Sequence, residues 1–67
     1  MPDIDLLKDK IDESGMTMTS IAEKAGIVRE TLYNRLNGNG EFKASEITSL
    51  THVLSLTKDE RDKIFLT

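Results

Sequence analysis

The sequence predicts an all-α fold, a compact bundle of five short helices packed at large angles to one another. Apolar residues recur three and four positions apart, as in Ile4, Leu7 and Ile11, which is the helical period. No stretch shows the strict alternation of a strand. Glycines and helix-capping residues punctuate the chain at short intervals. With 67 residues, we expect one domain covering residues 1–67.

The first two helices are bounded by side-chain caps and glycines. Asp3 or Asp5 is expected to cap the first helix, and Gly15 to end it. Thr17 is expected to cap the second helix, and Gly26 to end it. The residues predicted to face inward on the second helix are Met18, Ile21, Ala22 and Ala25.

Three further helices follow. The third runs from about Val28 to Leu36 and buries Leu32 and Leu36. The run at 37–40, Asn-Gly-Asn-Gly, is the strongest break in the chain, because both residue types tolerate positive φ. The fourth helix is expected from about Ala44 to Leu54, with Ile47, Leu50 and Leu54 inward. The last begins at the capping box Thr57-Lys58-Asp59-Glu60 and carries Ile64 and Phe65.

The spacing of small residues between 17 and 36 indicates a helix-turn-helix motif. Two helices cross over a short turn only where certain positions are small or flexible. Ala22 lies where the helices would approach most closely, and Gly26 allows the left-handed backbone of the turn. Ile27 would fill the corner, and Leu32 would anchor the second helix of the motif.

This segment resembles the helix-turn-helix of phage repressors and Cro proteins, and of the related xenobiotic-response-element-type regulators. The chain as a whole looks like the small Cro-like proteins of phages that infect Gram-positive bacteria. The similarity lies in Tyr33-Asn34-Arg35-Leu36-Asn37, a Gly/Asn turn, Phe42 and the ending Lys63-Ile64-Phe65-Leu66. It implies a lambda-repressor-like five-helix bundle that reads DNA with the helix at about 28–36.

The resemblance also implies roles for individual residues. Those at the start and on the outer face of the recognition helix would contact bases in the major groove: Arg29, Glu30, Tyr33 and Asn34. Arg29 would pair with guanine, Asn34 with adenine, and Glu30 would accept from cytosine. An alternative for Glu30 is an ion pair with Arg29 or Lys24. Residues expected at phosphates are Thr17, Arg35, Asn37, Asn39 and Lys43.

Charge is distributed unevenly around a net value of −3. Residues 1–16 hold five acidic and two basic residues, a balance of −3, whereas residues 17–43 hold four basic and three acidic residues, a balance of +1. Residues 44–67 hold four acidic and three basic residues, a balance of −1. Only the central segment can therefore face phosphates without net repulsion.

Other classes of function receive no support from composition. The chain has no cysteine, and its one histidine, His52, is expected to be exposed. Asp3, Asp5 and Asp9 lack the loop glycine and closing glutamate of a calcium loop. We expect no metal, no cofactor and no catalysis. No apolar run approaches the length of a membrane helix, and no signal peptide is evident, so a cytoplasmic location is expected.

Two functions remain open. The first is a phage or prophage repressor that covers a double-stranded DNA operator, as a homodimer that pairs through apolar residues near the C-terminus. These residues are Leu56, Ile64, Phe65 and Leu66, and they exceed what so short a helix can bury by itself. The alternative is an antirepressor that binds a phage repressor protein. The acidic balance favours it, as do Met18 and Val28, which replace the glutamine and the Ser/Thr cap usual in the family.

Overall fold

Local capping signals set the helix boundaries in the computed structural model, which describes residues 2–66. Five helices occupy this range, and it contains no strand: α1 (Ile4–Ser14), α2 (Met18–Ala25), α3 (Arg29–Leu36), α4 (Ala44–Val53) and α5 (Lys58–Phe65). The all-α prediction is confirmed, and every predicted helix is present within about one residue of its expected bounds. The predicted domain, 1–67, extends one residue beyond the described range at each end.

Three of the five helices begin with the side-chain cap that the sequence predicts. Asp3 accepts from the amide of Leu6, Thr17 from that of Ser20, and Thr57 from that of Glu60, each at 3.1 Å. These bonds satisfy amides that have no partner within the helix. The N-cap residues of α3 and α4 are Val28 and Lys43, which provide no side-chain cap bond.

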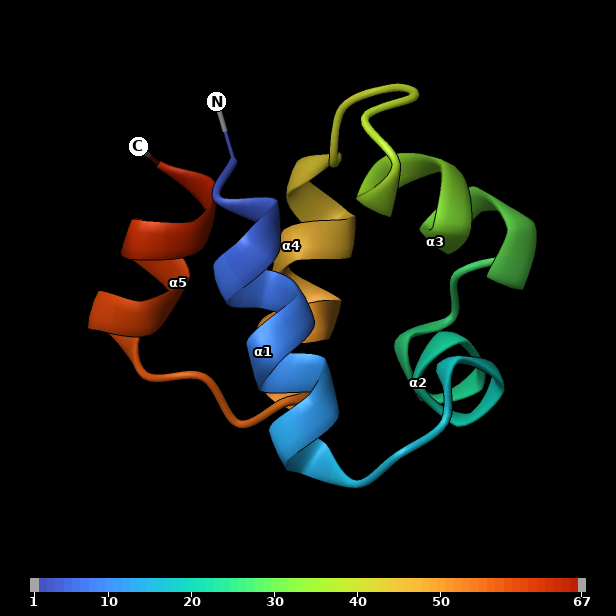
Figure 1. Cartoon of the computed structure of the whole chain (residues 1–67), viewed down its shortest axis with the longest axis horizontal. Helices are drawn as coiled ribbons and strands as arrows, with labels where there is room; N and C mark the ends of the chain where they lie inside the picture. The colour runs from blue at the N-terminus through green and yellow to red at the C-terminus, as the bar shows by residue number, and fades with distance from the viewer. Residues whose placement is uncertain (1, 67) are drawn as a thin grey trace.

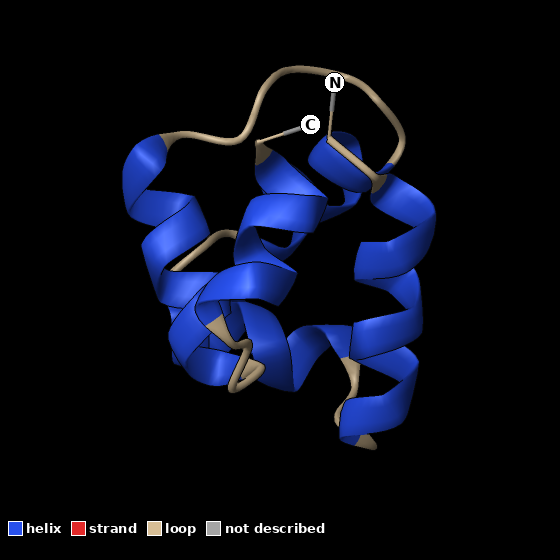
Figure 2. Ribbon diagram, turned by 90° about the vertical axis from the view of Figure 1, so that its left-hand side faces the viewer, coloured by secondary structure: helices blue, strands red, loops and turns tan. Residues whose placement is uncertain are grey.

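The helices surround one apolar core to which each contributes. The five residues with no exposed surface are Leu7, Ile21, Leu32, Leu50 and Ile64, one from each helix in order. Helix α2 contacts α3 and α4, and α5 contacts α1 and α4. Figure 1 shows α5 and α3 on opposite sides of the molecule, with α1 in front of α4 between them. The view turned by 90° shows helices on several sides of the molecule, joined by loops (Figure 2).

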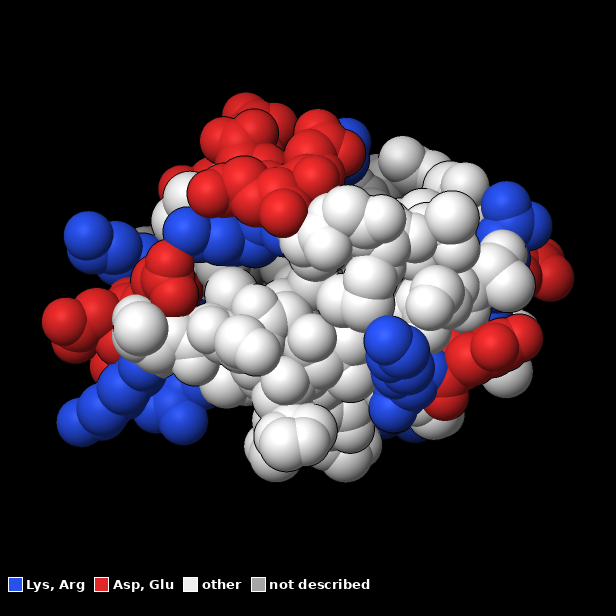
Figure 3. Space-filling model, turned by 90° about the horizontal axis from the view of Figure 1, so that it is seen from below, with Lys and Arg blue, Asp and Glu red and all other residues white. Residues whose placement is uncertain are grey.

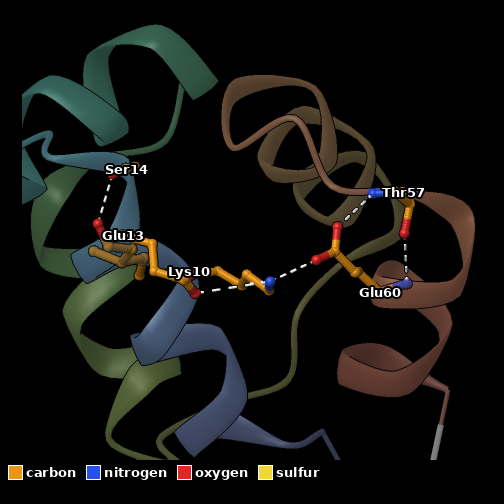
Figure 4. Close-up of polar contacts among 6 residues, drawn as sticks. Lys10, Glu13, Ser14, Thr57 and Glu60 are labelled. Atoms are coloured by element: carbon orange, nitrogen blue, oxygen red, sulfur yellow. Dashed lines mark hydrogen bonds and ion pairs between the residues drawn. The ribbon is translucent and has the colours of Figure 1, made fainter.

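A polar clasp, defined here as the ion pair and hydrogen bonds that involve Lys10, Glu60 and Thr57, joins α1 to α5 outside the core. Lys10 pairs with Glu60 at 2.5 Å, and Glu60 also accepts from the amide of Thr57 at 2.9 Å (Figure 4). The hydrogen bond from Lys10, followed by that from Thr57, lowers the pKa of Glu60 from 4.5 to about 2. The same hydrogen bond raises the pKa of Lys10. The amide of Asp3 donates to the carbonyl of Ile64 at 2.6 Å, so a backbone hydrogen bond accompanies the clasp.

One expectation about the C-terminal apolar residues is wrong. Leu56, Ile64 and Phe65 are buried within a single chain, because α5 packs against both α1 and α4. Phe65 also meets Phe42 edge-on, with ring centres 5.3 Å apart. Of the four residues expected at a dimer interface, only Leu66 is exposed, at 70%. A surplus of apolar surface on α5 therefore no longer argues for a dimer.

Within residues 2–66, no helix combines the length and apolarity needed to cross a bilayer.

Candidate nucleic-acid interface

Helix α3 has one buried face and one exposed face. Leu32 and Leu36, one turn apart, are buried in the core. The four residues predicted to contact bases all lie on the exposed side: Arg29, Glu30, Tyr33 and Asn34. The helix therefore brings four polar or charged side chains together at the surface.

The turn between α2 and α3 is fixed by backbone hydrogen bonds. Gly26 has φ +68°, its amide donates to Glu23 at 3.2 Å, and the amide of Ile27 donates to Ala22 at 3.0 Å. This pair of bonds is the Schellman motif, which ends a helix with one left-handed residue. Ala22 is only 2% exposed, as expected for a residue at a close approach of helices. The start of α3 is therefore held at a defined distance from α2.

Arg29 and Tyr33 contact each other on the outer face of α3. Nη2 of Arg29 donates to the Tyr33 hydroxyl oxygen at 3.3 Å, and the guanidinium carbon lies 4.9 Å from the ring centre. The alternative expected for Glu30 is not found, since no ion pair joins it to Arg29 or Lys24 within residues 2–66. The Arg29–Tyr33 contact was not predicted from the sequence, although the spacing of four residues was a usable signal.

Arg35, expected at a phosphate, lies against a carboxylate. Its Nε is 3.4 Å from Oε1 of Glu46, with the two side chains only 18% and 12% exposed. Nη1 lies 3.5 Å from the carbonyl oxygen of Asn39, and a Cβ on Gly40 would be 2.5 Å from that nitrogen. Glu46 also accepts from the amide of Lys43 at 2.8 Å. Arg35 therefore fastens the loop after α3 to the start of α4, and its charge is largely compensated.

The other predicted phosphate contacts lie in two places. Asn37, Asn39 and Lys43 are exposed in the loop that follows α3. Thr17 is exposed at the start of α2, where its hydroxyl oxygen already accepts from the amide of Ser20. The loop residues adjoin the C-terminal end of α3, so they belong to the same part of the chain as the exposed face.

Two exposed apolar or aromatic residues and two grooves lie on or near this face. Val28, directly before α3, is 69% exposed, and Tyr33 is 40% exposed. A groove of about 300 Å³ separates α3 from α1 and α2 and is lined in part by Ile11, Met18 and Leu36, with Tyr33 also on its wall. A larger groove of about 530 Å³ lies between the N-terminus, the loop after α3 and the end of α5; Phe42 and Phe65 line it. In the sequence Val28 was notable only as an unusual cap, and its exposure adds apolar surface beside the exposed face of α3.

The comparisons with known proteins give no relative for this chain. No family model, curated protein or solved structure matches it. Among residues 2–66, no group of three or more His, Cys, Asp or Glu side chains is arranged to hold a metal ion.

Proposed function

We propose that this protein binds double-stranded DNA in a sequence-specific manner through a helix-turn-helix formed by α2 and α3, and that it regulates transcription by covering an operator. The observation that carries the proposal is the division of α3 into a buried leucine face and an outer face with four polar or charged side chains. A purely structural helix needs no such grouping of base-compatible groups.

The dimensions of α3 suit the major groove. An α-helix with its side chains is about 10–12 Å in diameter, and the groove is about 12 Å wide. Arg29 offers the fork of donors that matches guanine, and Asn34 the donor and acceptor that match adenine. Val28, exposed at the end of α3 that would enter the groove first, suits contact with a thymine methyl group.

Electrostatics predict modest affinity for a single copy. Since Arg35 is paired with Glu46, the predicted contacts include only Arg29 and Lys43 as uncompensated cations. Arg29 is expected at a base, so one neutralised phosphate, at Lys43, corresponds to a slope of log K against log salt of about −1 per copy. We therefore propose that two copies bind half-sites about one helical turn apart. Leu66, at 70% exposure, is the apolar C-terminal residue that remains for contact between them.

The test begins with selection of duplexes by the wild-type protein from a randomised library. Binding of the selected duplex is then measured by fluorescence anisotropy at two salt concentrations. Arg29→Ala should weaken binding by about 1–3 kcal/mol and relax selection at one base pair. Lys63→Ala removes one exposed cation from α5, on the opposite side of the molecule (Figure 1), and should leave that preference intact. Failure of the wild type to enrich any sequence would contradict the proposal.

A second candidate function, an antirepressor that binds a repressor protein, is favoured by the surface charge. Asp5, Asp9, Asp12 and Glu13 are all exposed on α1. Figure 3 shows acidic side chains gathered in one patch, next to a broad surface without charged residues. Such a surface is complementary to the basic DNA-reading face of another regulator, and the attraction would speed their encounter.

The same selected duplex separates the two candidates. If the antirepressor function holds, a phage repressor encoded by an adjacent gene should dissociate from its operator DNA when this protein is added. Neutralising Asp9 and Asp12 to asparagine should then weaken the protein complex, while Arg29→Ala should have little effect on it. If the DNA-binding function holds, Arg29→Ala should weaken binding to the selected duplex, and neutralising Asp9 and Asp12 should not weaken it.

A further inference from the structure

Two of the four exposed side chains on α3 form a unit before any ligand is bound. Arg29 and Tyr33 lie one turn apart on the same face, so their side chains meet without any change in the backbone. The guanidinium group lies over the tyrosine ring, 4.9 Å from its centre, and donates to the tyrosine hydroxyl oxygen at 3.3 Å. Attraction between a cation and the face of an aromatic ring supports the first contact.

Nothing else among residues 2–66 competes for Arg29. No carboxylate pairs with it, although Glu30 is its neighbour in the chain. Tyr33, by contrast, has a second environment, because it lines the groove between α1, α2 and α3 together with Met18 and Leu36. Tyr33 thus packs against the rest of the protein, and Arg29 is oriented by its contact with Tyr33.

From this contact we infer that Tyr33 is a positioning residue that holds the Arg29 guanidinium ready for bidentate recognition of a guanine, and does not itself read a base. The inference rests on the proposed DNA-binding function. An arginine has five N–H donors, and the bond to Tyr33 occupies one of them. Four donors remain, and two suffice for the O6 and N7 atoms of guanine. A long side chain that is already oriented loses less rotamer freedom when it binds.

The pairing also has a consequence for the tyrosine hydroxyl group. Its oxygen accepts from Arg29, which leaves the hydroxyl hydrogen free to donate. The Arg29 guanidinium presents donors only, which suits the acceptor edge of guanine and a nearby phosphate. Adenine, which presents a donor at N6 beside N7, is a poor match for this arrangement.

A double-mutant cycle on the duplex selected by the wild type tests the inference. The variants are Arg29→Ala, Tyr33→Leu, Tyr33→Phe and the combination of Arg29→Ala with Tyr33→Leu. Each is titrated with the duplex and with copies in which one guanine at a time is replaced by 7-deazaguanine, which lacks the N7 acceptor. The wild type should show a loss of affinity at the one guanine that Arg29 reads, and Arg29→Ala should abolish that loss.

The expected signature of positioning is coupling between the two residues. Tyr33→Leu should reduce the 7-deazaguanine effect by roughly two- to fivefold, the range expected for an exposed cation–aromatic contact. Tyr33→Phe keeps the ring and loses only the hydroxyl group, so its reduction should be smaller. In the Arg29→Ala background, Tyr33→Leu should have no further effect on that guanine. Lys63→Ala should leave the 7-deazaguanine effect at its wild-type size.

Failure of the inference and failure of the proposed function give different results. If the duplex is bound specifically but Tyr33→Leu weakens guanine and 7-deazaguanine duplexes equally, with additive effects in the cycle, Tyr33 does not position Arg29. If the wild type enriches no sequence, the proposed function fails and the inference falls with it. Circular dichroism and thermal unfolding of each variant identify loss of folding. Should Tyr33→Leu not fold, Tyr33→Phe still decides: a reduced 7-deazaguanine effect supports the inference, and an effect of wild-type size contradicts it.

Discussion

Two helix ends in this molecule follow the same backbone path with different residues at the turn. At the end of α2, Gly26 has φ +68°, with bonds from Gly26 to Glu23 and from Ile27 to Ala22. At the end of α4, Ser55 has φ +53°, its amide donates to His52 at 3.2 Å, and the amide of Leu56 donates to Thr51 at 2.9 Å. Both ends are Schellman motifs, one with the residue best suited to positive φ and one without it.

The difference indicates that burial of the apolar residue after the turn can stabilise positive φ at a residue other than glycine. Leu56, directly after Ser55, is buried in the core, whereas Ile27, directly after Gly26, is only partly buried. At the α4 end, burial of Leu56 offsets the strain of a left-handed serine. At the α2 end, the backbone is unstrained, and the chain continues into the exposed candidate interface.

The largest expected effect in this comparison comes from Leu56. Leu56→Ala should lower the free energy of unfolding by about 2–4 kcal/mol, because it leaves a cavity and removes the contact that offsets the strained turn. Urea denaturation measures the change. Leu66→Ala is the matched control, since Leu66 is 70% exposed and should change stability by less than about 0.5 kcal/mol. Equal losses for the two variants would mean that Leu56 is not a core residue.

The next effect concerns the turn that carries α3. Gly26→Ala should destabilise the protein by about 1–2 kcal/mol, because an L-residue at this φ is strained. No atom lies within 4 Å of the position a Cβ would take, so the cost comes from the backbone alone. Ser55→Ala is the control, because it exchanges one L-residue for another at the second turn; its effect should be near zero. A neutral Gly26→Ala would show that the α2 turn relaxes to another geometry.

The two turns also mark how far the sequence predicts the fold. Gly15 and Gly26 identify the ends of α1 and α2, because glycine is the usual left-handed residue. Ser55 carries no such signal, yet the end of α4 was predicted within a residue, since the apolar period stops there and the capping box at Thr57 follows. The burial of α5 was underestimated, because local patterns do not reveal that α1 and α4 both cover it.

The candidate site was predictable to a smaller extent. Exposure of Arg29 and Asn34 follows from the helical period once Leu32 and Leu36 are placed inward. The Arg29–Tyr33 contact was accessible from their spacing. The pairing of Arg35 with Glu46 was not, because they lie eleven positions apart with a loop between them, and only the tertiary fold brings them together.

A smaller effect, opposite in sign, is expected at the second turn. Ser55→Gly should stabilise the protein by about 0.5–1 kcal/mol, because glycine adopts positive φ without strain, although it also gains more entropy on unfolding. Ser55 is exposed and its side chain makes no hydrogen bond within residues 2–66, so its loss removes no contact. A rise in the midpoint of thermal unfolding would confirm the prediction. A fall would mean that the turn is not strained by serine.

The last prediction concerns the charged contact that follows the second turn and has no counterpart at the first. Glu60 caps the start of α5 and pairs with Lys10 on α1 (Figure 4), whereas Val28 provides no side-chain cap for α3. Because the pKa of Glu60 is lowered from 4.5 to about 2, the unfolded chain binds more protons than the folded chain between these values. The contribution of the ionised Glu60 carboxylate to the free energy of unfolding is therefore full above about pH 4.5 and is lost as the pH falls towards 2.

Urea midpoints measured across this range should decline less steeply for Glu60→Gln than for the wild type. Glu23→Gln, at an exposed residue without an ion pair in residues 2–66, should retain the wild-type profile. Identical acid profiles for wild type and Glu60→Gln would mean that the link between α1 and α5 depends on the buried core and the backbone bond from Asp3, with no contribution from the charged pair.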